Sequence, residues 1–426
     1  MHQFPIVPSY KRWVSNNGRK NTPISRLRWI FIVVTRSLRY SKSPAICENV
    51  HQKALDEHWD MKMIHMPFLA NVPVPVGSLD EAVTSRYANQ SHMGFAAQFL
   101  ICLPHAKTYG GGLVQLANGQ FLSESSWRLN SMLGSKHYKT WFRRNTASLE
   151  GDYYNLQTFW GGNYGHWLYE DVPRLLSALP HLPDNVKFLI PRDMGSWKLE
   201  SLYALGIKED QLHPIDGHCE AHCERLWFAT ELGSSREFIT SPSVVKKLRM
   251  QLLQHAESDL KGDDCEGLPV VERIFISRGN SSNERLTNED DLIEVAKTLG
   301  FEVISPLDYS LLEQINIFKN AKIIVGVFGA ALTNIMFAKP NATLVDLQDG
   351  SYFACPRVWF WKMAYAFGMR YKTIVGKPDD IKNWGEINFS IDPQFFYESL
   401  REICKTMASA EPEAVDFYRP VADLED

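Results

Sequence analysis

The amino-acid sequence predicts an α/β protein with two Rossmann-like domains, each built on a parallel sheet. From Tyr153 onward, short apolar runs alternate with helical patterns, which is typical of a parallel, doubly wound sheet. A chain of 426 residues is also too long for one compact core, which favours two domains. The polar run at 261–267, with two glycines, predicts the linker between them.

The first half of the chain contains a turn signal and several apolar runs. Asn118 and Gly119 favour the positive φ angles of a type I′ turn, which predicts a β-hairpin between the runs at 113–117 and 120–123. The further elements expected here are strands at 186–190 and 226–230, a helix at 197–205 that ends at Gly206, and a helix from Pro242 to about Leu260 with Ser241 as its cap.

The second half alternates between strand and helix patterns. The segment 323–327 is wholly apolar, as expected for a strand that helices cover on both faces. Thr287 and Asp290 have the spacing of a capping box, at the start of a helix that Gly300 ends. The other elements expected are strands at 270–277, 301–304 and 343–347, and helices at 311–320 and from Ala330 onward.

Composition argues against a nucleic-acid-binding protein, and it leaves two interpretations of the amino-terminal segment. The net charge of −4 gives no reason to expect a nucleic-acid partner. Eight Lys and Arg residues lie in the first forty, no acid precedes Glu48, and the apolar run at 29–34 is too short to cross about 30 Å of hydrocarbon. Two interpretations stay open: a basic, aromatic surface that lies on an anionic membrane, or a buried strand or helix turn with solvated flanks.

The cysteines favour a reducing compartment. There are seven of them, an odd number with loose spacing and no evident secretory signal, so we expect free thiols in the cytoplasm. The run 218–223 has His and Cys pairs four residues apart, which could bind a metal from one helical face. We favour ordinary side chains on a loop or helix edge, and expect no metal. For the aromatic group at 359–367, core packing is favoured over stacking on sugar rings.

The segment 325–334 joins a buried strand to a helix and is compatible with a phosphate. In a parallel sheet, ligands bind beyond the carboxyl ends of the strands, and a helix start there offers unpaired N–H groups and a positive dipole end. Gly329 and Ala330 remove side-chain bulk, so that a phosphate could approach the backbone. Small residues at such a turn can also serve packing alone.

Two arginines follow the first strand of the same sheet. Arg278 comes directly after Ser277, and Arg285 lies on the loop beyond it. The strand ends should converge on one crevice, where guanidinium groups can bind a diphosphate through paired hydrogen bonds. The alternative is that both arginines form surface ion pairs with the nearby acids, which are Glu284, Glu289 and Asp290.

Several separate motifs together resemble glycosyltransferase family 61, over roughly residues 109–347. Their order and spacing make the resemblance more specific than any single motif. The motifs are Asn163-Tyr164-Gly165-His166-Trp167-Leu168-Tyr169-Glu170-Asp171-Val172-Pro173-Arg174-Leu175, Ser277-Arg278, Arg285-Leu286-x-Asn288-Glu289, Gly300-Phe301-Glu302, Glu313-Gln314 and Phe328-Gly329-Ala330-Ala331-Leu332-Thr333-Asn334.

The resemblance implies the GT-B arrangement, in which two Rossmann-like domains face each other across a cleft. It implies metal-independent, inverting transfer of a hexosyl or pentosyl group from a nucleotide sugar, such as a UDP-sugar, to a saccharide hydroxyl. Synthesis of a cell-surface polysaccharide, such as a capsule, or of a glycoconjugate would fit that activity, and no further cofactor is implied. The donor-binding residues expected on this basis are Ser277, Arg278, Arg285, Glu313, Gly329, Ala330, Thr333 and Asn334.

This sequence departs from the family pattern at two positions. Phe328 replaces the His of the family's turn, which puts the donor contact of that side chain in doubt. Glu170 replaces an Asp, which is a milder change. The alternative function is therefore a catalytically weakened protein that binds a nucleotide sugar or assists assembly. An enzyme with a dinucleotide cofactor is disfavoured, because no Gly-x-Gly-x-x-Gly follows a strand.

The segment 166–179 predicts a helix that carries the candidate base. At 100° per residue, His166 and Glu170 share one arc with Pro173, where a kink is expected, and with Ser177. An inverting transfer needs a base for the acceptor hydroxyl, and a carboxylate hydrogen-bonded to an imidazole can serve. We rank Glu170 first, His166 second and Asp171 last, because Asp171 points away from that arc. A structural pair that caps the helix start is the alternative.

These inferences divide the chain into four expected segments. Residues 1–75 form a basic extension, and residues 76–260 form the acceptor domain with the hairpin, where Asn163 and Arg174 face the cleft. Residues 268–395 form the nucleotide-sugar domain, and residues 396–426 a helix with an acidic tail. The partners expected are a nucleotide sugar and a saccharide or glycoconjugate, with the protein in the cytoplasm or on the inner face of the membrane.

Overall fold

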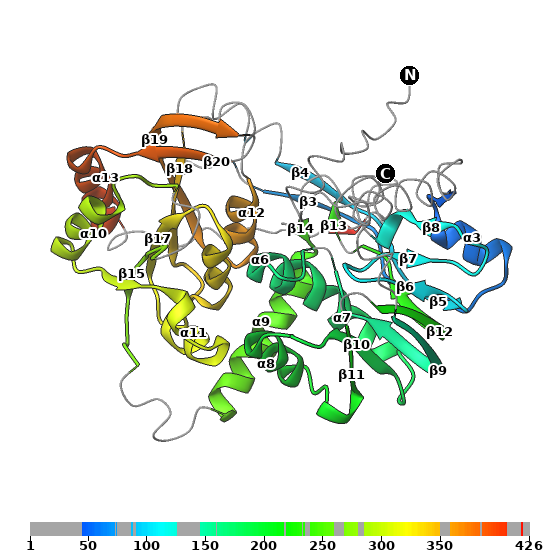
Figure 1. Ribbon diagram of the computed structural model, residues 1–426. Helices are drawn as coiled ribbons and strands as arrows, with labels where there is room; N and C mark the ends of the chain where they lie inside the picture. The colour runs from blue at the N-terminus through cyan, green and yellow to red at the C-terminus, as the bar shows by residue number, and fades with distance from the viewer. Residues whose placement is uncertain are drawn as a thin grey trace, which may run out of the picture.

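The computed structural model describes residues 45–72, 74, 87, 91–125, 145–158, 160–216, 219–231, 233–234, 239–259, 268–279, 285–349, 358–383, 386–406 and 419–420. Within these residues, two α/β halves lie side by side, each with its own large sheet, and helices fill the space between the sheets (Figure 1). The basic segment before residue 45, the expected linker at 261–267 and, apart from Arg419–Pro420, the acidic tail after Glu411 fall outside the described residues.

The described part of the first half contains a sheet of ten strands, in the order β1-β8-β7-β6-β12-β9-β10-β11, with β5 and then β2 attached along β12. Its bounds are β1 Ile46–Cys47, β2 Met61–His65, β5 Gln98–Pro104, β6 Lys107–Thr108, β7 Val114–Gln115, β8 Phe121–Leu122, β9 Asn145–Asn155, β10 Lys187–Pro191, β11 Leu212–Ile215 and β12 Cys219–Ala229.

The expectation of a parallel sheet holds for only part of this half. Strands β12, β9, β10 and β11 run parallel, whereas β5, β6 and β7 pair antiparallel. Strands β6, β7 and β8 follow one another through short connections, which need no crossover helix, whereas β5 and β6 also pair with β12, much later in the chain. Small pairings complete this half: β3 Phe68–Asn71 with β4 His92–Phe95 and β21 Arg419–Pro420, and β13 Gly233–Ser234 with β14 Ile239–Thr240.

The helical segments of the first half include a short α-helix on the outer face and a series that faces the second half. The bounds are α3 Val50–Asp56, η1 Ser123–Ser125, α6 Tyr164–His166, the π-helix η3 Trp167–Asp171, α7 Val172–Ala178, η4 Leu179–His181, α8 Ser196–Ala204, η5 Glu209–Gln211 and α9 Pro242–Asp259.

The second half is a doubly wound sheet with the strand order β16-β15-β17-β18-β19-β20, in which only β20 is antiparallel among the described strands. The chain leaves β15 toward one side and β17 toward the other, so the topological switch point lies between their carboxyl ends. The strands are β15 Arg273–Ile276, β16 Glu302–Ile304, β17 Ile323–Val327, β18 Thr343–Asp349, β19 Arg370–Asn383 and β20 Glu386–Ser390.

Helices cover both faces of the second sheet. On the outer face, α10 Glu289–Thr298 and α13 Pro393–Thr406 bury one apolar cluster against the strands. On the inner face, α11 Leu311–Phe318, η8 Ala330–Phe337 and α12 Trp359–Ala366 share a cluster with α7, α8 and α9 of the first half. A short turn, η7 Pro306–Asp308, precedes α11. One continuous apolar core therefore holds the two halves together.

Most elements expected from periodicity are confirmed within one to three residues at each end. The strand at 323–327 and the start of the helix at Pro242 are confirmed to the residue. The hairpin is confirmed as β7 and β8, but its turn is not of type I′, because Gly119 has a positive φ of 86° and Asn118 does not. A helix at the carboxyl end, α13, is also present, although it begins at Pro393.

The helix expected from Ala330 is present, in the 3-10 conformation. Two other local predictions are wrong. Helix α10 begins after Asn288 without a capping box, because the Thr287 hydroxyl donates to Asp379 instead. The run around Cys219 and Cys223 belongs to strand β12, so its spacing makes no helical face; both thiols are buried and free. In the described part of the chain, no three potential ligands gather to hold a metal ion.

Candidate active site

The turn after β17 lies at the switch point of the second sheet. Val327 ends the strand, Phe328 to Ala330 are half-buried, and η8 begins at Ala330. The Arg285 guanidinium donates from Nη1 to the backbone oxygen of Phe328 at 2.7 Å. A Cβ built on Gly329 would lie 2.8 Å from Nη1 of Arg278. Both arginines therefore converge on this turn, as the strand order predicts.

The loop after β15 is ordered by a carboxylate. Glu289 accepts from the Ser277 hydroxyl at 3.1 Å and from the Arg278 backbone N–H at 3.1 Å. Burial lowers the pKa of Arg278 and raises the pKa of Glu289. Since Glu289, Asp290 and Asp291 occupy the first turn of α10, that helix start repels anions. The neutral start of η8 is the better place for a phosphate.

A second candidate group lies on the helix that follows Asn163 in the first half. The Asn163 side chain caps α6 by accepting from the N–H groups of Gly165 and His166. His166 Nδ1 and Glu170 Oε1 are 2.9 Å apart, which confirms the expected hydrogen bond. The side chain of Glu170 is 28% exposed and that of His166 16%, so both can meet a ligand.

The helix carrying this pair is irregular. Five residues, Trp167–Asp171, form a π-helical segment between α6 and α7, with Pro173 near the start of α7. Proline lacks the N–H that would continue the regular ladder, and π-helical insertions are frequent at functional sites. The π-helical segment is wider than an α-helix, and in it Trp167, Leu168 and Tyr169 are all buried while Glu170 faces outward.

Asp171 is buried beside the pair and differs from Glu170 in its surroundings. It accepts from the Thr158 hydroxyl at 2.7 Å and from Arg174 at 3.3 Å. Burial raises its pKa to about 6. Arg174 points into the same buried group, with Tyr154 and Thr158, in a narrow pocket behind the helix. Asp171 therefore anchors the loop before α6, and its side chain has little access to a ligand.

Aromatic rings connect the two candidate groups. His166 stacks on Trp160 at a centroid distance of 5.5 Å and meets the edge of Trp359 at 5.2 Å. Trp359 lies parallel to Phe360, which in turn contacts Phe328 at 5.1 Å. The prediction that the 359–367 group is mainly core is supported for Phe360, Trp361 and Phe367, which are buried. Trp359 is the member that reaches the candidate base.

Two residues expected to bind the donor, Asn334 and Glu313, have structural partners for their side chains, whereas the Thr333 hydroxyl is buried without a hydrogen-bond partner among the described residues. Thr333 and Asn334 are fully buried, and Asn334 Oδ1 accepts from the Tyr164 hydroxyl of the first half at 2.8 Å. Glu313 accepts from the backbone N–H of Ser310 at 2.7 Å and closes a capping box on α11. Direct donor contacts by these residues stay predictions. The Tyr164 contact was missed because it joins residues 170 positions apart.

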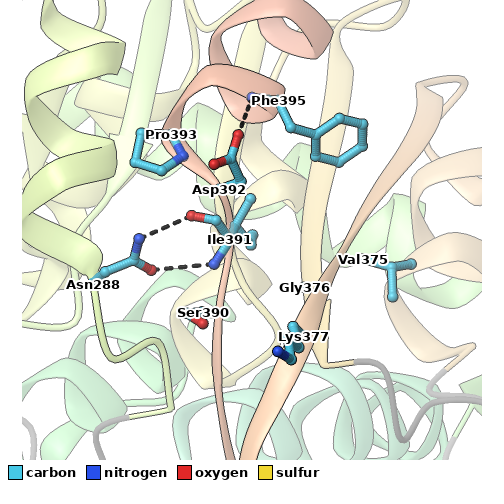
Figure 2. A pocket seen from close by; sticks show the side chains of 9 residues that line it. All are labelled: Asn288, Val375, Gly376, Lys377, Ser390, Ile391, Asp392, Pro393 and Phe395. Atoms are coloured by element: carbon cyan, nitrogen blue, oxygen red, sulfur yellow. Dashed lines mark hydrogen bonds between the residues drawn. The ribbon is translucent and has the colours of Figure 1, made fainter.

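A separate hollow of about 450 Å³ lies at the outer side of the second sheet, between β19, the end of β20 and the start of α13 (Figure 2). Apart from Lys377, its polar side chains are already engaged: Asn288 bonds both backbone groups of Ile391, Asp392 caps the helix at Phe395, and Ser390 donates to Asp379. With its exposed Phe395 ring it is a shallow apolar notch, and it lies apart from the candidate groups above.

The turn after β17 and the His166–Glu170 pair come from different halves, and the contact between α6 and η8 joins the elements that carry them. Residues 164–345 match the Glycosyltransferase 61 family, and this range contains both candidate groups. The resemblance to glycosyltransferase family 61 is thereby confirmed over that segment.

A xylan glycosyltransferase of Arabidopsis thaliana is 35% identical to this chain over 89 residues. The match covers 20% of this chain and 18% of that relative, so the chain aligns with less than a fifth of the relative's length. In the described part of the chain, none of the helices has the length and apolar character needed to cross a membrane.

Proposed function

We propose that the protein is a glycosyltransferase that moves a sugar from a nucleotide donor to a saccharide hydroxyl with inversion at the anomeric carbon. The observation that carries the proposal is the convergence of Arg278 and Arg285 on the Phe328–Gly329 turn, in the segment matched by the family. Guanidinium groups beside a helix start are suited to the diphosphate of a nucleotide sugar. The UDP-sugars are the donors we would test first.

In this proposal the two halves act as the donor and acceptor domains of a GT-B enzyme. The second half binds the nucleotide sugar through Ser277, Arg278, Arg285 and the backbone at Gly329 and Ala330. The first half, with the segment from Asn163 to Arg174, binds the acceptor. The apolar cluster that spans both halves and the contact between α6 and η8 support this facing arrangement.

The proposed reaction is a single displacement. The acceptor oxygen attacks the anomeric carbon while the bond from that carbon to the diphosphate oxygen breaks. The acceptor proton passes to the Glu170 carboxylate, which His166 holds in place through its 2.9 Å hydrogen bond. The charge that develops on the leaving diphosphate is stabilised by Arg278, Arg285 and the N–H groups at the start of η8. No step requires a metal ion.

Glu170 is preferred as the base over Asp171 because of access. Glu170 keeps 28% of its side chain exposed, whereas both Asp171 oxygens are hydrogen-bonded in a buried site. The half-buried Trp359 beside His166 offers an apolar face on which a sugar ring could stack. A saccharide acceptor is consistent with the xylan-directed relative, and a surface polysaccharide or glycoconjugate remains the proposed product class, made in the cytoplasm.

A second function is motivated by Phe328. Its ring packs edge-on against Phe360. Because phenylalanine has no titratable group, this position of the turn offers a donor no acid, base or charge. The alternative is a protein that binds a nucleotide sugar without turning it over. Binding of UDP together with no transfer or hydrolysis of any UDP-sugar would favour this alternative.

The first prediction tests the proposed base. Purified protein is incubated with a panel of UDP-sugars and with xylo-oligosaccharides and other oligosaccharides, and UDP release and product are measured. We expect Glu170→Gln to lower kcat at least 100-fold, because base catalysis contributes about 10² to 10⁴. UDP affinity should change less than twofold. The matched control is Asp184→Asn, an exposed carboxylate of the same half. Full activity of Glu170→Gln would refute the assignment of the base.

A further inference from the structure

The two halves meet through polar contacts between α6 with its π-helical continuation and η8. The Tyr164 hydroxyl donates to Asn334 Oδ1 at 2.8 Å, and the Tyr169 hydroxyl donates to the backbone oxygen of Thr333 at 3.1 Å. Burial raises the pKa of both hydroxyl groups, which keeps them protonated as donors. Two neighbouring residues of η8 are thus each bound by a tyrosine from the other half.

The orientation of the Asn334 amide is fixed from the other side. Its Nδ2 donates to Gln314 Oε1 at 2.9 Å and to the backbone oxygen of Ala331 at 3.3 Å. Gln314 Nε2 donates in turn to the backbone oxygen of Tyr309 at 3.0 Å. Because Nδ2 has two acceptors, Oδ1 is the atom left to accept from Tyr164. A fully buried amide held in this way is a rigid connection.

The backbones approach closely at the same place. A Cβ built on Gly165 would lie 3.0 Å from Thr333 Oγ1 and 3.8 Å from Ala330 Cα. Gly162, three residues earlier, has nothing within 4 Å of such a Cβ. Gly165 therefore lets α6 lie against the first turn of η8, and any larger side chain would move the two apart.

This contact joins the two parts of the candidate active site. Tyr164 lies two residues before His166, and η8 begins at Ala330, directly after Gly329. We propose that Tyr164 and Asn334 form a positioning latch, which holds the His166–Glu170 pair at a fixed distance from the sugar bound at the Gly329 turn. The proposal rests on the glycosyltransferase function above. It assigns Asn334 the role of holding the two halves in a fixed relative position.

The latch acts on the chemical step and leaves donor binding intact. The arginines that hold the diphosphate belong to the loops after β15, whereas Tyr164 belongs to the other half. Loss of the latch would let the base move relative to the anomeric carbon, and small displacements of a reacting group cost one to two orders of magnitude in rate. Neither residue exchanges a proton with the substrate, so both are positioning residues.

The test is Tyr164→Phe, which removes one oxygen and leaves the ring in place. We expect kcat with a UDP-sugar to fall about tenfold, while the donor KM and the Kd of UDP change less than twofold. Tyr109→Phe is the matched control: its hydroxyl donates to Gln115 within the hairpin of the first half, and kcat should not change. Gly165→Ala should lower kcat in the same way, with Gly162→Ala as its control.

A double-mutant cycle separates the latch from general damage. If Tyr164 acts through the base, Tyr164→Phe should slow a Glu170→Gln protein less than twofold. An equal tenfold loss in both backgrounds, an unchanged kcat in Tyr164→Phe, or a tenfold weaker UDP affinity would each overturn the latch. Loss of activity in Glu170→Gln together with normal kcat in Tyr164→Phe would refute the latch and leave the proposed function standing.

A measurement independent of turnover covers the case of an inactive protein. We expect UDP to slow amide hydrogen exchange in residues 164–171 of the wild type, because the latch transmits order from the turn to the helix. The same UDP concentration should protect 328–337 but not 164–171 in Tyr164→Phe. Equal protection of 164–171 in both proteins would overturn the latch. Absence of UDP binding would instead refute the proposed function, and the latch with it.

Discussion

The turn after β17 and the helix after Asn163 build their parts of the site in opposite ways. The turn is made of regular elements that end at the right place, and it offers backbone N–H groups and room at Gly329. The helix offers side chains, and it bends through a π-helical segment to present Glu170 while burying Asp171. A phosphate can be bound by backbone geometry alone, whereas a base requires one particular side chain in one orientation.

The strongest test of the comparison between the turn and the helix is to replace two glycines by alanine. Gly329 lies in the turn after β17, and Gly326 lies in β17 itself. Gly329 has an extended backbone that alanine can adopt, but its Cβ would displace the Arg278 guanidinium. We expect Gly329→Ala to weaken UDP binding at least tenfold without loss of thermal stability.

Gly326 provides the matched variant, because it lies three residues earlier and inside the core. Its Cβ would meet Leu332 Cδ2 at 3.0 Å and Ile276 Cβ at 3.2 Å. Gly326→Ala should therefore lower the free energy of unfolding by about 1–3 kcal/mol and leave UDP affinity unchanged. Calorimetric titration and thermal melting separate the two effects. Two variants with the same profile would contradict a backbone-built donor site.

A smaller effect is expected from Asp171, the buried acid in the helix that follows Asn163. The pKa of Asp171 is raised from 3.8 to about 6 by burial, so the folded protein binds this proton more tightly than the unfolded chain. The resulting stabilisation is full below about pH 4 and is lost as the pH rises through 6, and it amounts to at most about 3 kcal/mol.

Asp171→Asn stays neutral throughout and should lack this loss. The difference in melting temperature, mutant minus wild type, should therefore increase between pH 4 and pH 7. The lost contact with Arg174 adds a difference that does not depend on pH. Glu231, whose pKa burial also raises, is present in both proteins and cancels. Parallel stability curves would show that Asp171 is ionised in the folded state over the whole range.

The two regions also differ in how far the sequence predicts them. Four strands of the second sheet, β15 to β18, follow from periodicity, because each is an apolar run followed by a helix, whereas β19 and β20 were not predicted. Strand order then brings Arg278 and Arg285 to the Gly329 turn. The His166–Glu170 contact follows from spacing along one helix, since i, i+4 neighbours face each other.

Contacts that depend on tertiary packing could not be predicted. The π-helical segment at Trp167 has no separate pattern, and the strand at 219–229 carries polar residues that resemble a loop. The capping box was placed at Thr287, although the structure has one at Ser310, because both sites have suitable residues and only packing selects one. The bond from Tyr164 to Asn334 joins segments that periodicity treats independently.

The central claim is that the turn at Phe328 and Gly329, with the two arginines beside it, binds the diphosphate of a nucleotide sugar. Its most direct test is calorimetric titration of UDP into the wild type, Arg285→Ala and Arg273→Ala. Arg273 is the first residue of β15, at the end of the strand away from the proposed donor site, and serves as the matched control. We predict that UDP binds the wild type and Arg273→Ala equally, and binds Arg285→Ala at least tenfold more weakly, a loss of about 1.4 kcal/mol. No binding of UDP to the wild type, or equal affinity in all three proteins, would contradict the claim.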